Sequence, residues 1–163
     1  TEADRKRLVE GGARGMSTFM SYYILKAVAS FDKEAAIAMY DAGCDIVFAV
    51  AGKTGLGVFE AGAEKGALAI GVDSDQKGEN PDVVACSMMK CVGDSIYVVV
   101  EQYLNDGVFA GGTIWDADLS TGLIKLGYGD ETMTQQVSDE LKAEADALME
   151  KIISGEIVVE STR

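Results

Sequence analysis

"LAIGVDSDQKGENPDVVACSMMK", residues 68–90, contains two apolar runs separated by a polar turn, and this pattern decides the expected fold. The runs, residues 67–72 and 82–88, are short and nearly continuous, which is typical of strands covered on both faces. Asp73 directly follows the first run, and Lys90 follows the second. Ligands of open parallel sheets bind beyond the carboxyl ends of the strands. We therefore expect both side chains at a ligand-binding edge.

Strand-like and helix-like segments alternate on the N-terminal side of this stretch and directly after it. Further strands are predicted at residues 22–30 and 44–51 from their β-branched, aromatic and apolar composition. Helices that end at a glycine are predicted over residues 32–43, with Asp32 as a candidate N-cap, and over 54–66 and 92–107. This alternation is typical of βαβ units, so the fold class is α/β, with a parallel sheet flanked by helices.

The pattern changes after Gly107. Residues 108–130 are glycine-rich and alternating, and we expect a hairpin or two extended crossing segments there. A long amphipathic helix is predicted over residues 134–156 and a terminal strand over 157–162. Because the chain has 163 residues and contains no long linker or repeat, we expect one α/β domain over residues 1–163.

Composition excludes several classes of function. The formal net charge of −13, without a basic cluster, argues against binding to nucleic acid or to an anionic membrane surface. The absence of histidine excludes a Ser-His-Asp or Cys-His catalytic set and any zinc site with a histidine ligand. The three cysteines lack the spacing of a thiolate metal site, and we expect all three to be small buried side chains.

The sequence contains no stretch of 18 or more apolar residues and therefore no candidate transmembrane helix. It contains no recognisable signal peptide and does not begin with Met. We interpret the chain as a mature, trimmed or subcloned piece of a protein.

A glycine-rich loop follows the strand expected at residues 44–51. Its residues, Ala51-Gly52-Lys53-Thr54-Gly55, lie before a predicted helix, where backbone N–H groups can approach the acceptor oxygens of a ligand. The Gly-Lys-Thr sequence is that of a P-loop, but Phe48 occupies the position of the upstream glycine. Nucleoside triphosphate binding is therefore not the favoured interpretation.

Four interpretations of Asp73 are open. It is a metal ligand together with Asp75, a catalytic acid or base, a helix cap in the turn, or an acceptor for two neighbouring hydroxyls. A metal site needs more ligands than these two carboxylates, and the sequence offers no obvious second catalytic group. Hydroxyl recognition requires only an ionised carboxylate, which accepts several hydrogen bonds at once. Sugar binding fits best, and the helix cap is the main alternative.

Several longer segments resemble the basic membrane protein family, the purine-nucleoside receptor type of substrate-binding lipoprotein that serves ABC transporters. The most specific is "YDAGCDIVFAVAGKTGLGVFEAGAEKGALAIGVDSDQ", residues 40–76. "CSMMKCVGDSIY", residues 86–97, is similar to the Ser-Met-x-Lys-x-x-Asp segment of the family. "GGTIWDADLSTGLIKLGYGD" resembles its crossover region and "KIISGEIVV" its C-terminal helix and last strand. The resemblance covers residues 22–160.

The resemblance implies a periplasmic-binding-protein fold of type I, in which two Rossmann-like lobes clamp a nucleoside. The chain would be mostly the C-terminal lobe, with residues 108–130 as hinge or crossover segments. It would act as an extracytoplasmic solute-binding protein, lipid-anchored to the cell membrane or periplasmic. Its partners would be the nucleoside, purine nucleosides favoured, the N-terminal lobe and an ABC transporter permease. The resemblance implies no cofactor, no metal and no catalysis.

The same resemblance assigns ligand-binding residues. Asp73 matches the ribose-binding aspartate of the family, and Lys90 matches the lysine of the Ser-Met-x-Lys segment. Ala51 and Gly52 belong to the loop that faces the cleft, and Phe31 matches the aromatic residue that flanks the base. Two features depart from the family pattern. Lys53 stands where the family commonly has glycine, and the segment that follows Phe31 is several residues shorter.

Two other functions remain open. One is an enzyme on the same α/β scaffold, a sugar- or nucleoside-processing isomerase or hydrolase that uses Asp73. The other is a regulatory or orphan lobe that has no ligand of its own. An isolated lobe exposes apolar surface and unpaired backbone that another lobe normally covers, so we also expect the chain to form a homodimer.

Overall fold

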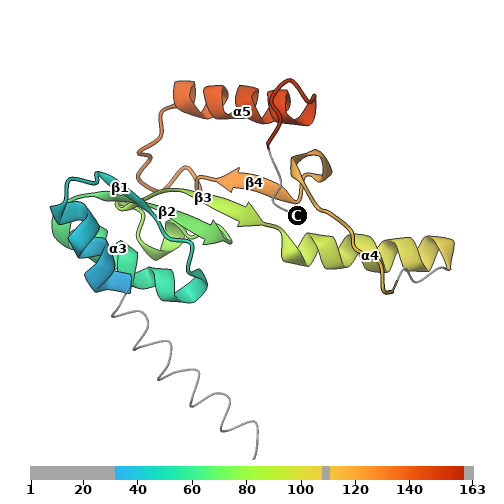
Figure 1. The fold of residues 1–163 in the computed structure, drawn as a ribbon, viewed down its shortest axis with the longest axis horizontal. Coiled ribbons are helices and arrows are strands. Elements are labelled where there is room, and N and C mark those ends of the chain that lie inside the picture. The colour runs from blue at the N-terminus through green and yellow to red at the C-terminus, as the bar shows by residue number, and fades with distance from the viewer. Residues whose placement is uncertain (1–31, 108–110, 160–163) are drawn as a thin grey trace, which may run out of the picture.

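The computed structural model of the chain describes residues 32–107 and 111–159 (Figure 1). The strand predicted at residues 22–30 and the candidate ligand-binding residue Phe31 lie outside these residues. Residues 157–159, which were expected to begin a terminal strand, are not part of a strand. The reason is local, because the N–H of Ile157 donates to the carbonyl of Lys151 at 3.0 Å and turns the chain back on the preceding helix.

Four strands form one sheet in the order β1-β2-β3-β4 (Figure 1). They are β1 (Ile46–Phe48), β2 (Leu68–Asp73), β3 (Val84–Lys90) and β4 (Ile124–Gly127). The first three strands are parallel, and β4 pairs with β3 in the antiparallel sense. The predicted α/β fold with a parallel sheet is confirmed. β4 comes from the 108–130 segment and adds an antiparallel strand at one edge.

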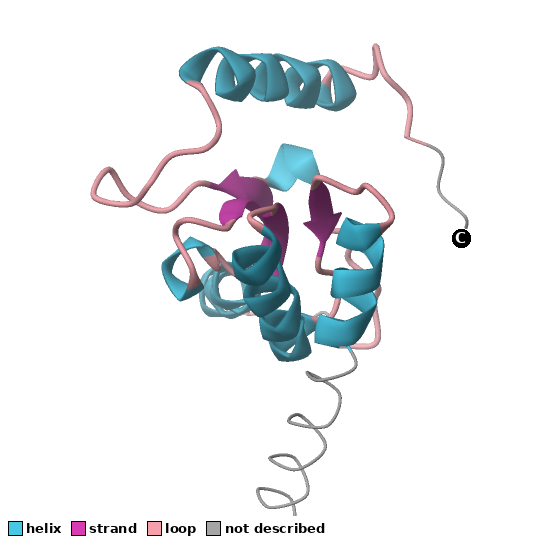
Figure 2. Ribbon diagram, turned by 90° about the vertical axis from the view of Figure 1, so that its left-hand side faces the viewer, coloured by secondary structure: helices cyan, strands magenta, loops and turns pink. Residues whose placement is uncertain are grey.

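The hydrophobic core lies on one face of the sheet. A helix that is described from residue 32 to residue 41 and α3 (Leu56–Lys65) pack against that face, where Tyr40, Phe59 and Val84 are buried. Figures 1 and 2 show α5 (Asp139–Ile153) on the opposite side of the sheet. Both core-facing elements end at a glycine with positive φ, Gly43 and Gly66, as predicted.

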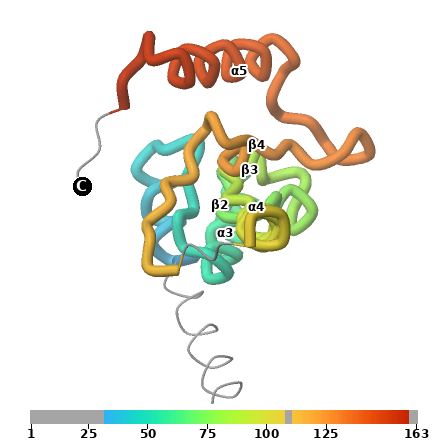
Figure 3. Tube along the Cα trace, turned by 90° about the vertical axis from the view of Figure 1, so that its right-hand side faces the viewer, coloured from blue at the N-terminus to red at the C-terminus, as the bar shows by residue number. Residues whose placement is uncertain are grey.

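The fourth helix, α4 (Val92–Asp106), continues from the end of β3 and projects away from the sheet (Figure 1). Figure 3 shows it nearly end-on. No residue of α4 is buried, and it ends at Gly107 in the left-handed conformation, as predicted. Its apolar side chains are therefore available at the surface.

No α-helix separates β2 from β3, in agreement with the polar turn expected between the two apolar runs. Residues 74–83 contain only a short 3-10 turn, Lys77–Glu79. The turn is compact because its polar side chains bond to the backbone: Gln76 Oε1 accepts from Val72 N, and Asp75 Oδ1 accepts from Lys77 N. The end of β2 is therefore joined to the start of β3 through a hydrogen-bonded turn.

The last helix is shorter than predicted. α5 begins at Asp139, with Ser138 as its N-cap, whereas the amphipathic pattern placed its start at residue 134. Two side chains hold the preceding segment out of the helix: Gln135 Nε2 donates to the carbonyl of Tyr128, and Gln136 Nε2 donates to the carbonyl of Pro81. The first bond joins the segment to the end of β4 and the second joins it to the β2–β3 connection before the helix begins.

Two smaller expectations were wrong. Cys44 is exposed, because it lies in the turn between the first described helix and β1, and Cys86 and Cys91 are only partly buried. Asp32 is already part of its helix and does not cap it. Within residues 32–107 and 111–159, none of the helices has the length and apolar character that a membrane span requires.

Gly62 tests the packing between α3 and the sheet. A Cβ atom at this position would lie 2.6 Å from Val83 Cγ1 and 3.0 Å from the carbonyl oxygen of Ala67. We expect Gly62→Ala to lower the free energy of unfolding by about 1–3 kcal/mol, as overpacking does. Gly93→Ala in α4 is the matched control, because a Cβ there meets no atom within 4 Å. Urea unfolding measures both, and equal stabilities of the two variants would contradict this packing.

Candidate ligand-binding site

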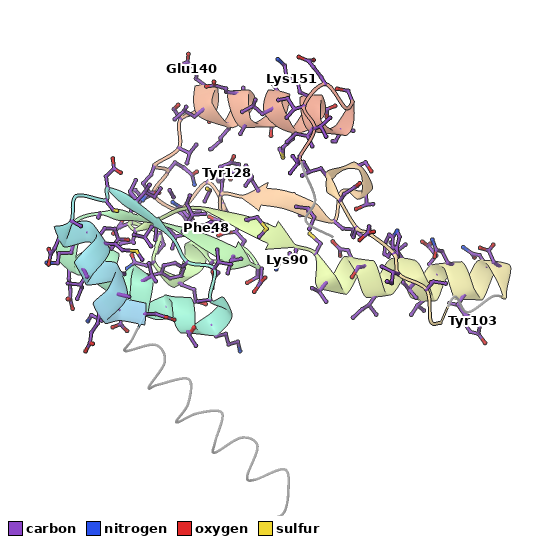
Figure 4. The ribbon with its side chains drawn as sticks, viewed as in Figure 1. Phe48, Lys90, Tyr103, Tyr128, Glu140 and Lys151 are labelled. Carbon is purple, nitrogen blue, oxygen red and sulfur yellow. The ribbon has the colours of Figure 1, made fainter. Side chains whose placement is uncertain are left out.

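Asp73 and Lys90 end two neighbouring parallel strands and meet at the edge of the sheet. Lys90 Nζ lies 3.1 Å from Asp73 Oδ1, and the side chains are 51% and 50% exposed. A pair this exposed contributes little to folding stability. Figure 4 shows Lys90 where β3 passes into α4. Both charged groups are therefore accessible to a ligand.

The backbone of Asp73 is in an unusual conformation. Its φ of 69° makes it the one non-glycine residue with positive φ in the described part of the chain. Aspartate tolerates the left-handed region better than most residues, but the conformation still requires support from its surroundings. Ser74 N donates to the carbonyl of Val72 at 2.9 Å and turns the chain sharply after the strand. The turn holds the carboxylate out beyond the end of β2.

The glycine loop after β1 lies beside this carboxylate. A Cβ built on Gly52 would be 3.8 Å from Asp73 Oδ2, and Gly52 has a φ of 54°. Ala51 precedes it and accepts a hydrogen bond from Thr54 Oγ1 at 2.7 Å, which closes the loop onto α3. The fold therefore places Ala51, Gly52, Asp73 and Lys90 at the same edge of the sheet.

An open hollow of about 460 Å³ begins at the Asp73–Lys90 pair and extends over the start of α4. Asp94 and Lys125 also line it, so two acidic and two basic side chains surround the space. Sequence analysis missed both added residues. Asp94 follows Lys90 by four residues, one more than in the Ser-Met-x-Lys-x-x-Asp pattern. Lys125 enters through the antiparallel pairing with Met89, which the sequence pattern does not reveal.

A second, smaller hollow of about 140 Å³ lies beside the glycine loop and is lined by Asp32, Phe48 and Ala51 among others. Phe48, the last residue of β1, is 46% exposed (Figure 4). Sequence analysis considered Phe48 only as a departure from the P-loop pattern. Because Phe48 ends β1, its aromatic side chain lies near the glycine loop that follows this strand.

Asp75 does not join Asp73 in a metal site. Its Oδ1 accepts from Lys77 N at 3.1 Å and its Oδ2 accepts from Gly129 N at 2.8 Å, so its carboxylate bonds the β2–β3 turn to the segment after β4. Among the residues that the structure describes, no three side chains of metal-binding type are grouped. Nor does Asp73 cap a helix, because the 3-10 turn begins after Gln76 and has no side-chain cap.

A buried polar group lies beneath the turn, and sequence analysis missed it. Lys77 is fully buried, and its Nζ donates to the carbonyl of Val84 at 2.5 Å and to Gln136 Oε1. Burial lowers the pKa of Lys77, and the nearby Asp75 carboxylate partly opposes this shift. Gln76 and Ser87 are also buried and bond to each other, Gln76 N donating to Ser87 Oγ at 3.0 Å.

Comparison with known proteins identifies relatives of the chain. Residues 29–163 match the family described as ABC transporter substrate-binding protein PnrA-like. Basic membrane protein C of Borreliella burgdorferi is 38% identical over 141 residues, covering 82% of this chain and 39% of that protein. Basic membrane protein A of Borreliella afzelii is 33% identical over 129 residues, covering 78% of this chain and 38% of that protein. The chain thus spans about two fifths of the length of these relatives.

Solved structures show the same fold at lower sequence identity. A solute-binding protein of an ABC transporter system from Aeropyrum pernix superposes with a TM-score of 0.64 at 23% identity, covering 82% of this chain and 45% of that chain. A transcriptional activator of the comK gene from Bacillus halodurans gives a TM-score of 0.60 at 20% identity, covering 74% and 40%. The family is one of substrate-binding proteins and not of enzymes, and the resemblance inferred from the sequence motifs is confirmed. The chain belongs to the PnrA-like family of ABC transporter substrate-binding proteins.

Proposed function

We propose that the chain is the nucleoside-binding C-terminal lobe of an extracytoplasmic solute-binding protein, with purine nucleosides as the favoured ligands. The observation that carries this proposal is the position of Asp73, a half-exposed carboxylate beyond a strand end, beside Gly52 and Lys90. Asp73 accepts hydrogen bonds from the two ribose hydroxyls, as an ionised carboxylate can. The strained turn supports this role, because such conformations occur at functional sites.

The neighbouring residues have distinct roles in this proposal. Lys90 is paired with Asp73 when no ligand is bound, and it donates to a ring nitrogen or carbonyl oxygen of the base when one is bound. Ala51 and Gly52 let the ligand approach the backbone closely, since Gly52 carries no side chain. Phe31, outside the described residues, is the aromatic residue that flanks the base in this proposal.

Calorimetric titration with adenosine, guanosine and inosine tests the proposal. We expect binding without turnover, and ribonucleosides should bind more tightly than 2′-deoxynucleosides or free bases. Product formation, followed by chromatography of the same mixtures, would favour the enzyme that uses Asp73. Failure of all nucleosides to bind, both to this chain and to a longer protein that contains it, would favour the orphan lobe.

The remaining partners follow from the length of the relatives. Because the chain spans about two fifths of those proteins, we propose that an N-terminal lobe closes over the Asp73 edge of the sheet. Residues 108–130 include the crossing segments between the two lobes. The whole protein then presents its nucleoside to an ABC transporter permease outside the cytoplasm, held at the membrane by a lipid anchor or free in the periplasm.

We also propose that the isolated chain forms a homodimer through α4. This helix projects from the body (Figures 1 and 4). Its apolar side chains include Ile96, Leu104 and Val100, which are 61%, 74% and 48% exposed. Exposed apolar surface of this kind favours association. A second copy of the chain is the partner proposed to cover these side chains, because it is always present in a solution of the isolated chain. Since each chain carries a net charge of −13, added salt should strengthen the dimer by screening repulsion.

Sedimentation equilibrium checks this prediction. We expect a dimer for the unchanged chain and a monomer for Ile96→Glu combined with Val100→Glu, because both charges would be buried at the interface. Gln102→Glu is the matched control, since it adds charge to the same helix at an exposed polar position, and it should remain dimeric. A monomeric unchanged chain at high concentration and high salt would refute the proposal.

A further inference from the structure

The turn that holds Asp73 depends on side chains that do not themselves face a ligand. β1 pairs with β2 only as far as Ile70, opposite Phe48. Two residues further along β2, the N–H of Val72 donates to Gln76 Oε1 at 2.7 Å. The side chain of Gln76 thus supplies the acceptor for the end of β2 where the neighbouring strand has already stopped.

Gln76 is fixed at both its backbone and its side chain. Its N–H donates to Ser87 Oγ at 3.0 Å, so the turn is also attached to β3. Gln76 is 8% exposed and Ser87 is fully buried, so water does not replace these bonds readily. The two hydrogen bonds of Gln76, from Val72 N–H to its Oε1 and from its own N–H to Ser87 Oγ, form a clamp. Asp73 lies between Val72 and Gln76 in the chain.

Gly71 makes room for the clamp. A Cβ at Gly71 would lie 2.7 Å from Ser87 Oγ and 3.0 Å from Gln76 Oε1. No other residue type allows the amide and the hydroxyl to lie so close to β2. Glycine, glutamine and serine therefore act together under the turn, and changing any of them alters the support of the residues above.

We propose that Gln76, held by Ser87, is a positioning residue that keeps Asp73 in its left-handed conformation before a ligand arrives. This proposal rests on the proposed nucleoside binding for its functional consequence, but not for its structural content. A carboxylate fixed in advance loses less conformational freedom on binding, which strengthens the complex. Without the clamp, Asp73 relaxes toward an ordinary negative φ, and its carboxylate no longer faces the Gly52 loop and Lys90.

Gln76→Met tests the proposal, because methionine has a similar length and lacks the amide acceptor. Tyr40→Phe is the matched control, since the Tyr40 hydroxyl donates to the carbonyl of Leu68 at 2.8 Å, at the opposite end of β2. The first measurement is the intensity of the nuclear Overhauser cross-peak between the N–H and Hα protons of Asp73. These two protons are closest, and the cross-peak is strongest, when φ is positive. We expect it to weaken in Gln76→Met and to be unchanged in Tyr40→Phe. An unchanged cross-peak in Gln76→Met overturns the proposal.

The second measurement is the ratio of guanosine affinity to 2′,3′-dideoxyguanosine affinity, which reports hydroxyl recognition by Asp73. We expect this ratio to fall by about tenfold in Gln76→Met and by less than about twofold in Tyr40→Phe. If the unchanged chain shows no such preference, the proposed ribose contact fails, while the NMR measurement still decides the positioning role. If the preference exists and survives Gln76→Met, the positioning role fails alone. Ser87→Ala, which removes only the acceptor of Gln76 N–H, provides the same two measurements if Gln76→Met does not fold.

Discussion

Asp73→Ala is expected to weaken ribonucleoside binding by about a hundredfold or more. A carboxylate that accepts from two adjacent hydroxyls makes two charge-assisted hydrogen bonds, each worth about 1.5–3 kcal/mol. Since 1.4 kcal/mol corresponds to a factor of ten, loss of both bonds gives at least the stated effect. Calorimetric titration with adenosine, guanosine and inosine measures it. A longer protein that contains these residues allows the same test from a tighter starting affinity.

Two further variants distinguish the contribution of the Asp73 carboxylate to binding from the contribution of the backbone conformation of the turn. Asp73→Asn keeps the shape and tolerates positive φ, but loses the charge and half of the acceptors, so it should also bind poorly. Asp73→Gly removes the carboxylate and relieves the backbone strain at a φ of 69°, so it should lose binding without losing stability. The exposed Asp73–Lys90 pair adds little to stability. Wild-type affinity in Asp73→Asn would rule out ribose recognition by this residue.

The sequence pattern predicts the two central strands well because their apolar runs are long enough to decide between strand and loop, whereas the strand expected at residues 44–51 is only Ile46–Phe48. β2 and β3 occupy residues 68–73 and 84–90, within two residues of the predicted runs at 67–72 and 82–88. The position of the Asp73–Lys90 pair follows from the same pattern, since neighbouring parallel strands bring their carboxyl ends together. Resemblance to the family motifs adds a proposed role for each residue, which strand ends alone do not provide.

Side-chain networks are what the sequence pattern does not predict. Gln135 and Gln136 continue a helical pattern, but their amides bond to the carbonyls of Tyr128 and Pro81 and delay the start of α5. Lys77 stands in the polar stretch between the two apolar runs and was not singled out from the sequence, yet it is fully buried. Gln136 has partners that are distant in sequence, since Lys77 lies 59 residues away and Pro81 lies 55 residues away. Local patterns carry no information about such partners.

Lys77→Ala should have the largest effect on stability, lowering the free energy of unfolding by about 3 kcal/mol. Its stem is tightly packed, because a Cβ at Gly129 would lie 2.5 Å from Lys77 Cγ. Truncation therefore leaves a cavity and also removes the donor of the Val84 carbonyl and of Gln136 Oε1. Urea unfolding followed by circular dichroism measures the change. Lys125→Ala, an exposed lysine on β4, should change stability by less than about 0.5 kcal/mol.

Lys77→Met distinguishes the contribution of the ammonium group to stability from that of the aliphatic stem, because methionine fills most of the same space. Burial lowers the pKa of Lys77 below its ordinary value of 10.5; Asp75, Cys86 and Asp82 oppose the shift, and Lys142 adds to it. Between the lowered pKa and 10.5, the unfolded chain binds a proton on Lys77 that the folded chain has lost. The stability contributed by Lys77 therefore rises with pH across this window.

The difference in stability between the unchanged chain and Lys77→Met should consequently grow as the pH rises toward 10.5. Taking the difference matters, because burial raises the pKa values of Tyr40, Cys86 and Tyr128, and these groups destabilise the fold in the same alkaline range. They are present in both proteins, so their contribution largely cancels. A difference that stays constant or shrinks over this range would mean that folding does not desolvate the Lys77 ammonium group.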